Sequence, residues 1–244
     1  MHISEYDKMA HAESDMWWYQ ALHIRLCRLI KRYVPPDSQI LDAGCGTGEL
    51  MRRVQGIPDK YHITGIDISN KAARWTWEKS HPNVVVGDIN DLPFKDEKFS
   101  AVVCADVLYH RAVDPHQAVR EAFRCLLPKG VLIANVPAYQ WMHSYHDDAI
   151  HTARRFTRRQ IVALLVSEGF SVPYSSYWNT FLFPLMVIRR KLLPTPKAGN
   201  DVSVPPVFLN RLFRFISTAE YALMCVGLRL PFGGSCIIVG VKND

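Results

Sequence analysis

Acidic residues stand at similar intervals in the first half of the chain, each beside a short apolar run. Asp42 opens the glycine-rich segment 42–48 (DAGCGTG), and Asp67 and Asp88 follow later runs. A carboxylate at a strand end can accept hydrogen bonds from both hydroxyls of a ribose, and a second one can accept from the amine of adenine. With Ile68 and Ile89 on either side of the base, this order predicts an adenosine site. Asp67 or Asp88, taken alone, could instead start a turn or cap a helix, and this alternative stays open for each of them.

The glycines of this segment are Gly44, Gly46 and Gly48, and a helical pattern follows them. Glycine at alternate positions lets the backbone turn sharply and lie against a ligand where a Cβ would collide. The dinucleotide-binding pattern G-x-G-x-x-G needs a third glycine where this chain has Glu49, whose carboxylate would face a pyrophosphate. We therefore expect a ligand that lacks a pyrophosphate.

Strand-like and helix-like patterns alternate from residue 37 to about residue 178 and must position these side chains. The predicted strands are Gln39–Ala43, His62–Ile66, Val84–Val86, Ala101–Ala105, Val131–Val136 and Phe170–Tyr174. Helical patterns include Lys71–Lys79, Pro115–Leu127 before a turn at residues 128–130, and a helix with a capping box at Thr157. This alternation indicates an α/β protein with βαβ units and a mainly parallel sheet covered on both faces.

Helical segments flank this core in what we expect to be a single domain, since about 100–200 residues is usual for one. Residues 1–36 are predicted to form a helical lid, residues 37–178 the core, residues 179–230 a helical insertion and residues 231–244 the final strand, Ser235–Val241. A Pro-rich loop, Pro194–Pro206, divides the insertion into the runs Asn179–Leu193 and Val207–Leu230.

The motifs LDAGCGTGEL, GIDIS, VVGDINDLPF, FSAVVCADVLYH and LLPKGVLIANVP, spread over residues 40–137, together resemble the class I S-adenosylmethionine-dependent methyltransferases. The resemblance implies a Rossmann-like, doubly wound, seven-stranded sheet with its last strand antiparallel, and S-adenosyl-L-methionine as cofactor. It also implies that Asp42, Gly44, Gly46 and Gly48 hold the methionine part. Asp67 resembles the ribose acid of the family, and Asp88 with Ile89 the adenine contacts. Ala105 matches a position whose backbone touches the methionine amino group.

Methyl transfer from a sulfonium is an in-line displacement, so alignment and exclusion of water supply most of the acceleration. A base is needed only where the acceptor carries a proton at neutral pH. The candidates that follow the fourth and fifth strands are Tyr109, His110, Tyr139, His143, Tyr145, His146, Asp147, Asp148 and His151. We take His146 first, as base or orienting residue, and His110 second, with a structural role as its alternative. His146, Asp147 and His151 have the spacing of a weak metal site, and we expect no metal.

Clustered arginines and aromatics suggest where the acceptor lies. Arg154, Arg155, Arg158 and Arg159 start a helical pattern, where positive charge opposes the helix macrodipole. An anionic acceptor would explain this placement, and a solvated helix face is the alternative. The stretch 16–19 (MWWY) resembles an aromatic lid that precedes the core in many relatives, and it could equally pack in the core.

Composition narrows the class of protein. Of 244 residues, 48% are hydrophobic and 21% are charged, which excludes disordered, collagen-like and coiled-coil chains. The six cysteines form no C-x-x-C pair, so we expect reduced thiols in a cytoplasmic protein. The N-terminus has no signal-peptide pattern, and the nearest apolar stretch, Phe170–Ile188, is too polar and too rich in proline to span a bilayer.

The leading hypothesis is methyl transfer to a small molecule or to a lipid- or glycan-linked precursor. The net charge of +6 also allows an RNA methyltransferase, although no recognition module is evident and a nucleic-acid partner is not expected. A non-catalytic S-adenosylmethionine-binding protein that acts through partners is a further alternative. An oxidoreductase would need the dinucleotide that Glu49 disfavours.

The insertion contains Phe181–Ile188, an apolar run followed at once by Arg189, Arg190 and Lys191. Such a segment can cover an acceptor pocket or form a homodimer contact. It can also lie in the surface of an anionic membrane as a peripheral contact. We favour the first two roles, and the sequence leaves the third open.

Overall fold

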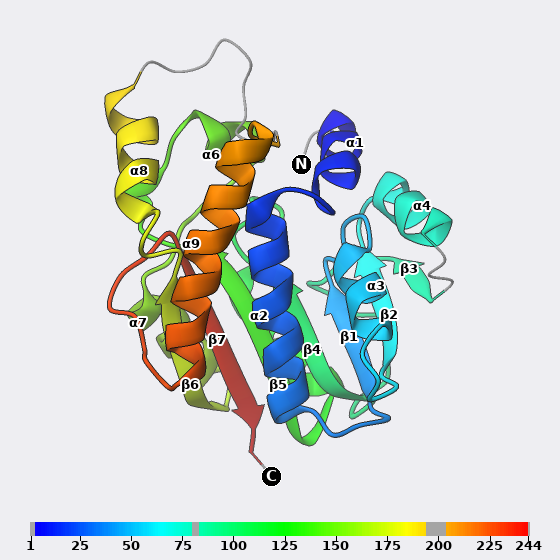
Figure 1. Ribbon diagram of the computed structural model, residues 1–244. Helices are drawn as coiled ribbons and strands as arrows, with labels where there is room; N and C mark the ends of the chain where they lie inside the picture. The colour runs from blue at the N-terminus through cyan, green and yellow to red at the C-terminus, as the bar shows by residue number, and fades with distance from the viewer. Residues whose placement is uncertain (1–2, 80–82, 194–203, 244) are drawn as a thin grey trace.

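The computed structural model describes residues 3–79, 83–193 and 204–243, and these form an α/β structure (Figure 1). Among these residues, seven strands make one sheet in the order β3-β2-β1-β4-β5-β7-β6. The strands are β1 (Gln39–Ala43), β2 (His62–Asp67), β3 (Val84–Val86), β4 (Phe99–Ala105), β5 (Leu126–Pro137), β6 (Phe170–Trp178) and β7 (Ser235–Lys242). The pairs from β3 to β5 are parallel, whereas β7 is antiparallel to both β5 and β6. The predicted fold class is therefore confirmed.

Helices cover both faces of the sheet. They are α1 (Ile3–Ala12), α2 (Trp17–Tyr33), α3 (Glu49–Gln55), α4 (Asn70–Glu78), α5 (Pro115–Cys125), α6 (Tyr145–Ala149), α7 (Arg158–Ser167), α8 (Phe183–Val187) and α9 (Val207–Cys225). Because side chains alternate along a strand, Ile40 of β1 packs with α2 and α3 while Leu41 packs with α5 and α7. Both faces of β1 are therefore buried, as the continuous apolar run of its sequence requires.

The boundary between α5 and β5 differs from the prediction. The helix expected over Pro115–Leu127 ends at Cys125, and β5 begins with the next residue. The segment Pro128-Lys129-Gly130, expected as a turn, lies inside β5, where the pairing with β4 shifts register. Lys129 takes a left-handed backbone with φ of +63°. The turn signal therefore marks a bulge that one long strand accommodates.

The N-terminal helices and the insertion meet on one side of the sheet. Figure 1 shows α9 running beside α2 in front of the strands. The Asn210 side chain accepts a hydrogen bond from Trp17 N at 2.9 Å and donates one to Asp15 O at 2.8 Å. Most of the predicted Pro-rich loop lies outside the described residues. No helix within the described ranges is long and apolar enough to span a membrane.

Glu220 of α9 holds the first residues of the insertion, directly after β6, in place. Its side chain is 1% exposed and accepts hydrogen bonds from the backbone N–H groups of Asn179, Thr180 and Phe181 at 2.6, 2.6 and 3.1 Å. The guanidinium of Arg25 from α2 lies 3.3 Å from the same carboxylate. One buried carboxylate therefore joins α2, α9 and the segment that follows β6.

We expect Glu220→Ala to destabilise the protein by about 3–5 kcal/mol, because it leaves the buried Arg25 and three backbone donors without their acceptor. Urea unfolding followed by circular dichroism measures this change. Thr218→Ala, an exposed substitution on the same helix, should cost less than about 0.5 kcal/mol. A loss below about 1 kcal/mol for Glu220→Ala would show that this carboxylate does not hold the insertion.

Candidate active site

Two adjoining cavities lie where the parallel strands end. The first has a volume of about 550 Å³ and the second about 770 Å³. Six residues line both of them, namely Trp18, Tyr19, Asp106, Tyr109, His146 and Ile150. A molecule in one cavity therefore lies next to a molecule in the other.

The glycine-rich segment wraps the end of β1 beside the first cavity. Gly44 and Gly48 have φ of +84° and Gly46 has φ of +55°, conformations that side-chain-bearing residues rarely adopt. Gly44 and Gly46 line the first cavity, as predicted. Gly48 does not line it but is the N-cap of α3, where an added Cβ would lie 2.9 Å from Thr76 Cγ2. Close packing against α4 thus explains Gly48 without a ligand.

Asp67 ends β2 and faces the first cavity with a carboxylate that already orders the loop. Its Oδ2 accepts from Gly46 N at 3.0 Å, and its Oδ1 accepts from Ser69 N at 2.9 Å. The Tyr6 hydroxyl from α1 donates to the same Oδ1 at 3.3 Å. Burial raises the pKa of Asp67, although the hydrogen bonds from Ser69 and Gly46 oppose the shift.

Asp42 supplies a buried acceptor to the same cavity. The residue is 1% exposed, and its Oδ2 has no hydrogen-bond partner among the described residues. Burial, followed by the nearby charges of Asp67 and Glu13, raises the pKa of Asp42 to about 7. A cationic donor in the first cavity, such as the ammonium group of a methionine moiety, would satisfy this oxygen.

The remaining predicted cofactor residues also line the first cavity. They are Ile68, Asp88, Ile89 and Ala105. Ile68 is 63% exposed and Ile89 is buried, so only Ile68 has much surface left to cover a ligand. Asp88 Oδ1 accepts from the backbone and side chain of Asn90 at 2.9 and 2.8 Å. The structure thus brings together the predicted cofactor positions apart from Gly48, while their contacts with a ligand stay predictions.

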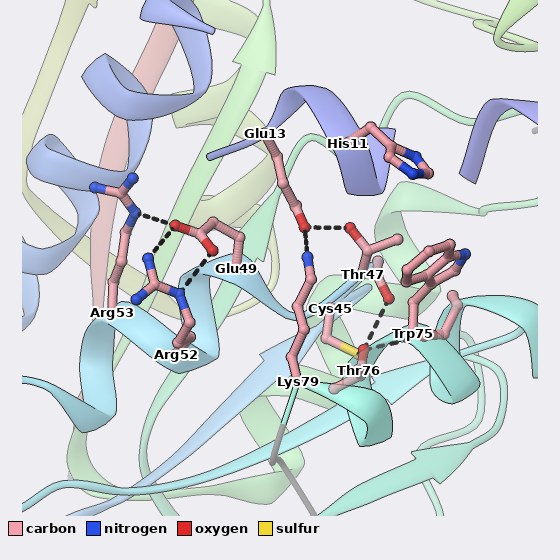
Figure 2. A network of polar contacts seen from close by, with 12 residues as sticks. His11, Glu13, Cys45, Thr47, Glu49, Arg52, Arg53, Trp75, Thr76 and Lys79 are labelled. Atoms are coloured by element: carbon pink, nitrogen blue, oxygen red, sulfur yellow. Dashed lines mark hydrogen bonds and ion pairs between the residues drawn. The ribbon is translucent and has the colours of Figure 1, made fainter. Parts of the chain in front are cut away.

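Helix α1 belongs to the segment 1–36 that was expected as a helical lid, and it lies over the glycine segment through contacts that the sequence did not predict. Figure 2 shows Glu13, just after α1, receiving the Thr47 hydroxyl at 2.5 Å and pairing with Lys79. Met9 also reaches the loop, because a Cβ on Gly46 would lie 2.6 Å from its methyl carbon. Tyr6, Met9 and Glu13 therefore line the first cavity with residues distant in sequence. The aromatic type of Tyr6 and the charge of Glu13 were the signals available in the sequence, and Met9 gave none.

Glu49 stands at the position where the dinucleotide-binding pattern has its third glycine, and two arginines bind its carboxylate. Arg52 donates to its carboxylate at 2.9 and 2.7 Å, and Arg53 donates at 2.8 Å (Figure 2). Burial alone would raise the pKa of Glu49, yet these hydrogen bonds lower it to about 2. The carboxylate of Glu49, which lines the first cavity, is therefore ionised and paired with two arginines.

The two predicted catalytic histidines occupy different places. His146 lines both cavities, whereas His110 lines only the first. Burial lowers the pKa of His110 to about 4, which keeps its ring neutral at pH 7. His143 lines neither cavity, and the described residues contain no group of histidine, cysteine and carboxylate side chains suited to a metal ion. The placement of His146 suits a group acting between two ligands, but its role stays a prediction.

Asp106 is a functional candidate that the sequence reasoning missed. It follows β4 with a left-handed φ of +57° and lines both cavities. Asn135 Nδ2 donates to Asp106 Oδ2 at 2.9 Å, and Trp178 Nε1 donates to Asn135 Oδ1 at 2.7 Å. Burial raises the pKa of Asp106 to about 7 despite the hydrogen bond from Asn135. Its place directly after Ala105 was the available signal.

The second cavity is built largely from the two helical additions. Residues 16–19 line it from the N-terminal side, and Leu182, Leu185, Met186 and Phe213 line it from the insertion. The aromatic stretch and the insertion thus both cover this cavity. Among the arginines of residues 154–159, only Arg155 lines it. Asp147, one of the base candidates, is 1% exposed and lies 2.6 Å from the Arg155 guanidinium, so it is an ion-pair partner.

Comparison with known proteins finds a family match over part of the chain. Residues 41–134 match the family described as a methyltransferase domain. A ubiquinone/menaquinone biosynthesis C-methyltransferase of Vibrio parahaemolyticus is 32% identical over 106 residues, 40% of each chain. A tRNA (carboxymethyluridine(34)-5-O)-methyltransferase of Arabidopsis thaliana is 29% identical over 121 residues, 49% of this chain and 28% of the other. The chain spans about half the length of the first curated relatives, 45%, 55% and 53%.

Solved structures confirm the fold. The 1,6-didemethyltoxoflavin-N1-methyltransferase of Burkholderia thailandensis, solved with S-adenosylhomocysteine, has a TM-score of 0.61 at 16% identity, covering 99% of this chain and 87% of the other. The sheet, the motif-bearing segment and these matches agree with the resemblance found in the sequence. The family match over residues 41–134 and the fold shared with solved methyltransferases therefore support a class I S-adenosylmethionine-dependent methyltransferase.

Proposed function

We propose that the protein transfers a methyl group from S-adenosylmethionine in the first cavity to a small-molecule or lipid- or glycan-linked acceptor in the second. The observation that carries this proposal is the shared wall of the two cavities, which places donor and acceptor side by side. In-line displacement depends on such alignment in a site that excludes water.

The residues of the first cavity fit the cofactor. When bound, S-adenosylmethionine supplies an electrophilic methyl group. Asp42 offers its unpartnered Oδ2 to the ammonium of the methionine part, and Asp67 offers its carboxylate to the ribose hydroxyls. Asp88 and Ile68 lie where the adenine contacts are proposed.

The shape and lining of the second cavity favour a small acceptor over an RNA. Trp17, Trp18, Leu182 and Phe213 give it apolar walls, and the insertion covers it. A concave, mostly apolar site with a few polar groups is typical of small-molecule recognition. Because tRNA methyltransferases are among the relatives, an RNA acceptor remains the alternative that the experiment must decide.

Asp106 and His146 are the side chains placed to remove a proton from the acceptor. Both line the shared wall, and the buried contact with Asn135 holds the Asp106 carboxylate in one orientation. A base is most effective when its pKa lies near the working pH, which the pKa of about 7 for Asp106 satisfies. We propose Asp106 as the base and His146 as the residue that orients the acceptor.

We expect Asp67→Ala to weaken S-adenosylhomocysteine binding at least about a hundredfold. It removes two charge-assisted hydrogen bonds to the ribose, each worth about 1.5–3 kcal/mol. Isothermal titration calorimetry measures the change, and Asp67→Asn, which keeps one acceptor oxygen, should lose less. Asp91→Ala, an exposed acid that lines neither cavity, is the matched control. Unchanged affinity in Asp67→Ala would refute the cofactor assignment.

We expect Asp106→Asn to lower methyl transfer by about 10²–10⁴-fold without weakening S-adenosylhomocysteine binding. Because the base is active when ionised, the wild-type rate should rise with pH through an apparent pKa near 7, and Asp106→Asn should lose this rise. His146→Gln should lower the rate and keep the pH dependence. The assay follows radiolabelled methyl groups from S-adenosylmethionine into an extract of the source cells.

The same assay decides between acceptor classes. A radiolabelled product that resists ribonuclease and passes a small-molecule filter agrees with a small-molecule acceptor. A labelled product that partitions into organic solvent agrees with a lipid-linked acceptor. Label that ribonuclease releases would assign an RNA acceptor instead. Full turnover in both Asp106→Asn and His146→Gln would show that neither residue takes part in the proton transfer.

A further inference from the structure

Two neutral side chains in the wall of the second cavity hold buried polar atoms without a partner. Thr152 and Asn179 are 3% and 5% exposed, and both line the second cavity but not the first. Thr152 Oγ1 and Asn179 Oδ1 make no hydrogen bond among the described residues. Buried polar atoms are nearly always hydrogen-bonded in a complete site. A ligand of the second cavity is therefore expected to supply the missing partners.

The backbone holds both side chains at this wall. Asn179 N donates to Glu220 Oε1 at 2.6 Å, and Asn179 O accepts from Gly234 N at 3.4 Å. Thr152 N donates to Asp147 O at 2.8 Å. Asn179 has a left-handed φ of +60°, which asparagine adopts more readily than most residues. This conformation accounts for an asparagine at the position, but it does not account for an unpaired amide oxygen in the cavity wall.

The charged side chains of the same wall already interact within the chain. Arg155 Nη1 lies 2.6 Å from Asp147 Oδ1, and Arg190 Nη1 lies 3.7 Å from Asp147 Oδ2. Lys8 and Arg189, which also line the cavity, take part in interactions of their own. The charged groups thus have partners inside the protein, and the buried neutral groups need theirs from a ligand.

A hydroxyl group is the neutral partner that both side chains can use. A threonine hydroxyl and an asparagine amide each contain a donor and an acceptor, and so does a ligand hydroxyl. A carboxylate or phosphate only accepts, so it would leave the amide oxygen of Asn179 without a donor. An ammonium group can donate to both oxygens, but a charge buried against neutral partners costs far more than a hydroxyl. The unpaired atoms therefore favour an uncharged alcohol or phenol.

The rest of the wall suits an apolar or aromatic body. Trp17 of α2 and Phe213 of α9 both line the cavity, and their rings meet edge to face with centres 5.6 Å apart. Leu182 and Met186 add aliphatic surface from the insertion. Aromatic side chains can bury a large part of a ligand and pack against its rings. A molecule that fills this cavity is therefore expected to have an apolar body that carries hydroxyl groups.

We propose that the second cavity binds an uncharged apolar compound through hydroxyl groups that hydrogen-bond to Asn179 and Thr152. Both residues then determine specificity, because a ligand without a hydroxyl leaves their polar atoms buried and unpaired. Naming this ligand the methyl acceptor rests on the proposed function, whereas the hydroxyl site itself does not. A hydroxyl carries a proton at neutral pH, which is the case in which the proposed base Asp106 is needed.

Four small aromatic probes test the hydroxyl site without the natural acceptor. 4-Propylphenol donates and accepts a hydrogen bond, 4-propylanisole only accepts, and 4-propylbenzoate and 4-propylbenzylamine carry opposite charges. Ligand-observed NMR titrations measure each dissociation constant with S-adenosylhomocysteine at saturation, so that the first cavity is filled. We expect the wild type to bind the phenol about tenfold more tightly than the anisole, because the ether leaves the amide oxygen of Asn179 unpaired. The phenol should also bind more tightly than either charged probe.

Substitution of the two residues tests whether they cause this preference. Asn179→Gly keeps the left-handed backbone and removes the amide, and Thr152→Val keeps the shape of the side chain and removes the hydroxyl. We expect the double variant to bind the phenol and the anisole within about twofold of each other, and each single variant to show an intermediate preference. Thr218→Val, an exposed substitution of the same type that lines neither cavity, should keep the full preference.

Equal affinities for the phenol and the anisole in the wild type would overturn the proposal, and this comparison needs no variant to fold. Tighter binding of the benzoate or the benzylamine would assign an ionic ligand instead, and a full preference in the double variant would place the hydroxyl contact elsewhere. Calorimetry with S-adenosylhomocysteine alone separates these outcomes from failure of the proposed function. Cofactor binding without a phenol preference would refute only this inference, and a phenol preference without cofactor binding would refute only the proposed function.

Discussion

A single line of buried polar contacts connects the parts of the protein that build the site. It begins at Glu220 on α9, which accepts from Arg25 of α2. The Arg25 guanidinium lies 4.6 Å from the ring centre of Trp178, whose indole N–H donates to Asn135, which in turn donates to Asp106. Each of these groups would be costly to bury alone. Helices α2 and α9 are therefore held in fixed positions relative to the strand end that separates the two cavities.

The centre of the sheet was predictable because strands such as β1 and β4 are buried on both faces. Runs such as Ile40-Leu41 and Val102-Val103 need apolar residues at successive positions, and such runs stand out in a sequence. The boundaries of helices and strands were harder to predict. Pro128-Lys129-Gly130 has the local sequence of a turn, and it is part of a strand only because β5 pairs with β4. The same limit applies wherever a contact partner decides the conformation of a segment.

The cofactor half of the site was predictable for a related reason. Parallel strands end at one edge of a sheet, so acids placed just after consecutive strands converge without knowledge of their contacts. Tyr6 and Asp67, or Arg190 and Asp147, meet across long stretches of chain, and no local pattern indicates these pairs. Asp106 was missed because its importance depends on Asn135 and Trp178, which lie on two other strands.

Of the segment that matches the family, residues 41–134, the described residues supply only Asp106 and Tyr109 to the wall of the second cavity. The rest of that wall comes from sequence before and after the match. Substitutions that reshape the second cavity can therefore accumulate while the shared segment changes little. Two proteins that agree closely over this segment need not modify the same compound. Engineering of acceptor choice belongs at residues such as Met16, Trp17, Leu182 and Met186, which line the second cavity and not the first.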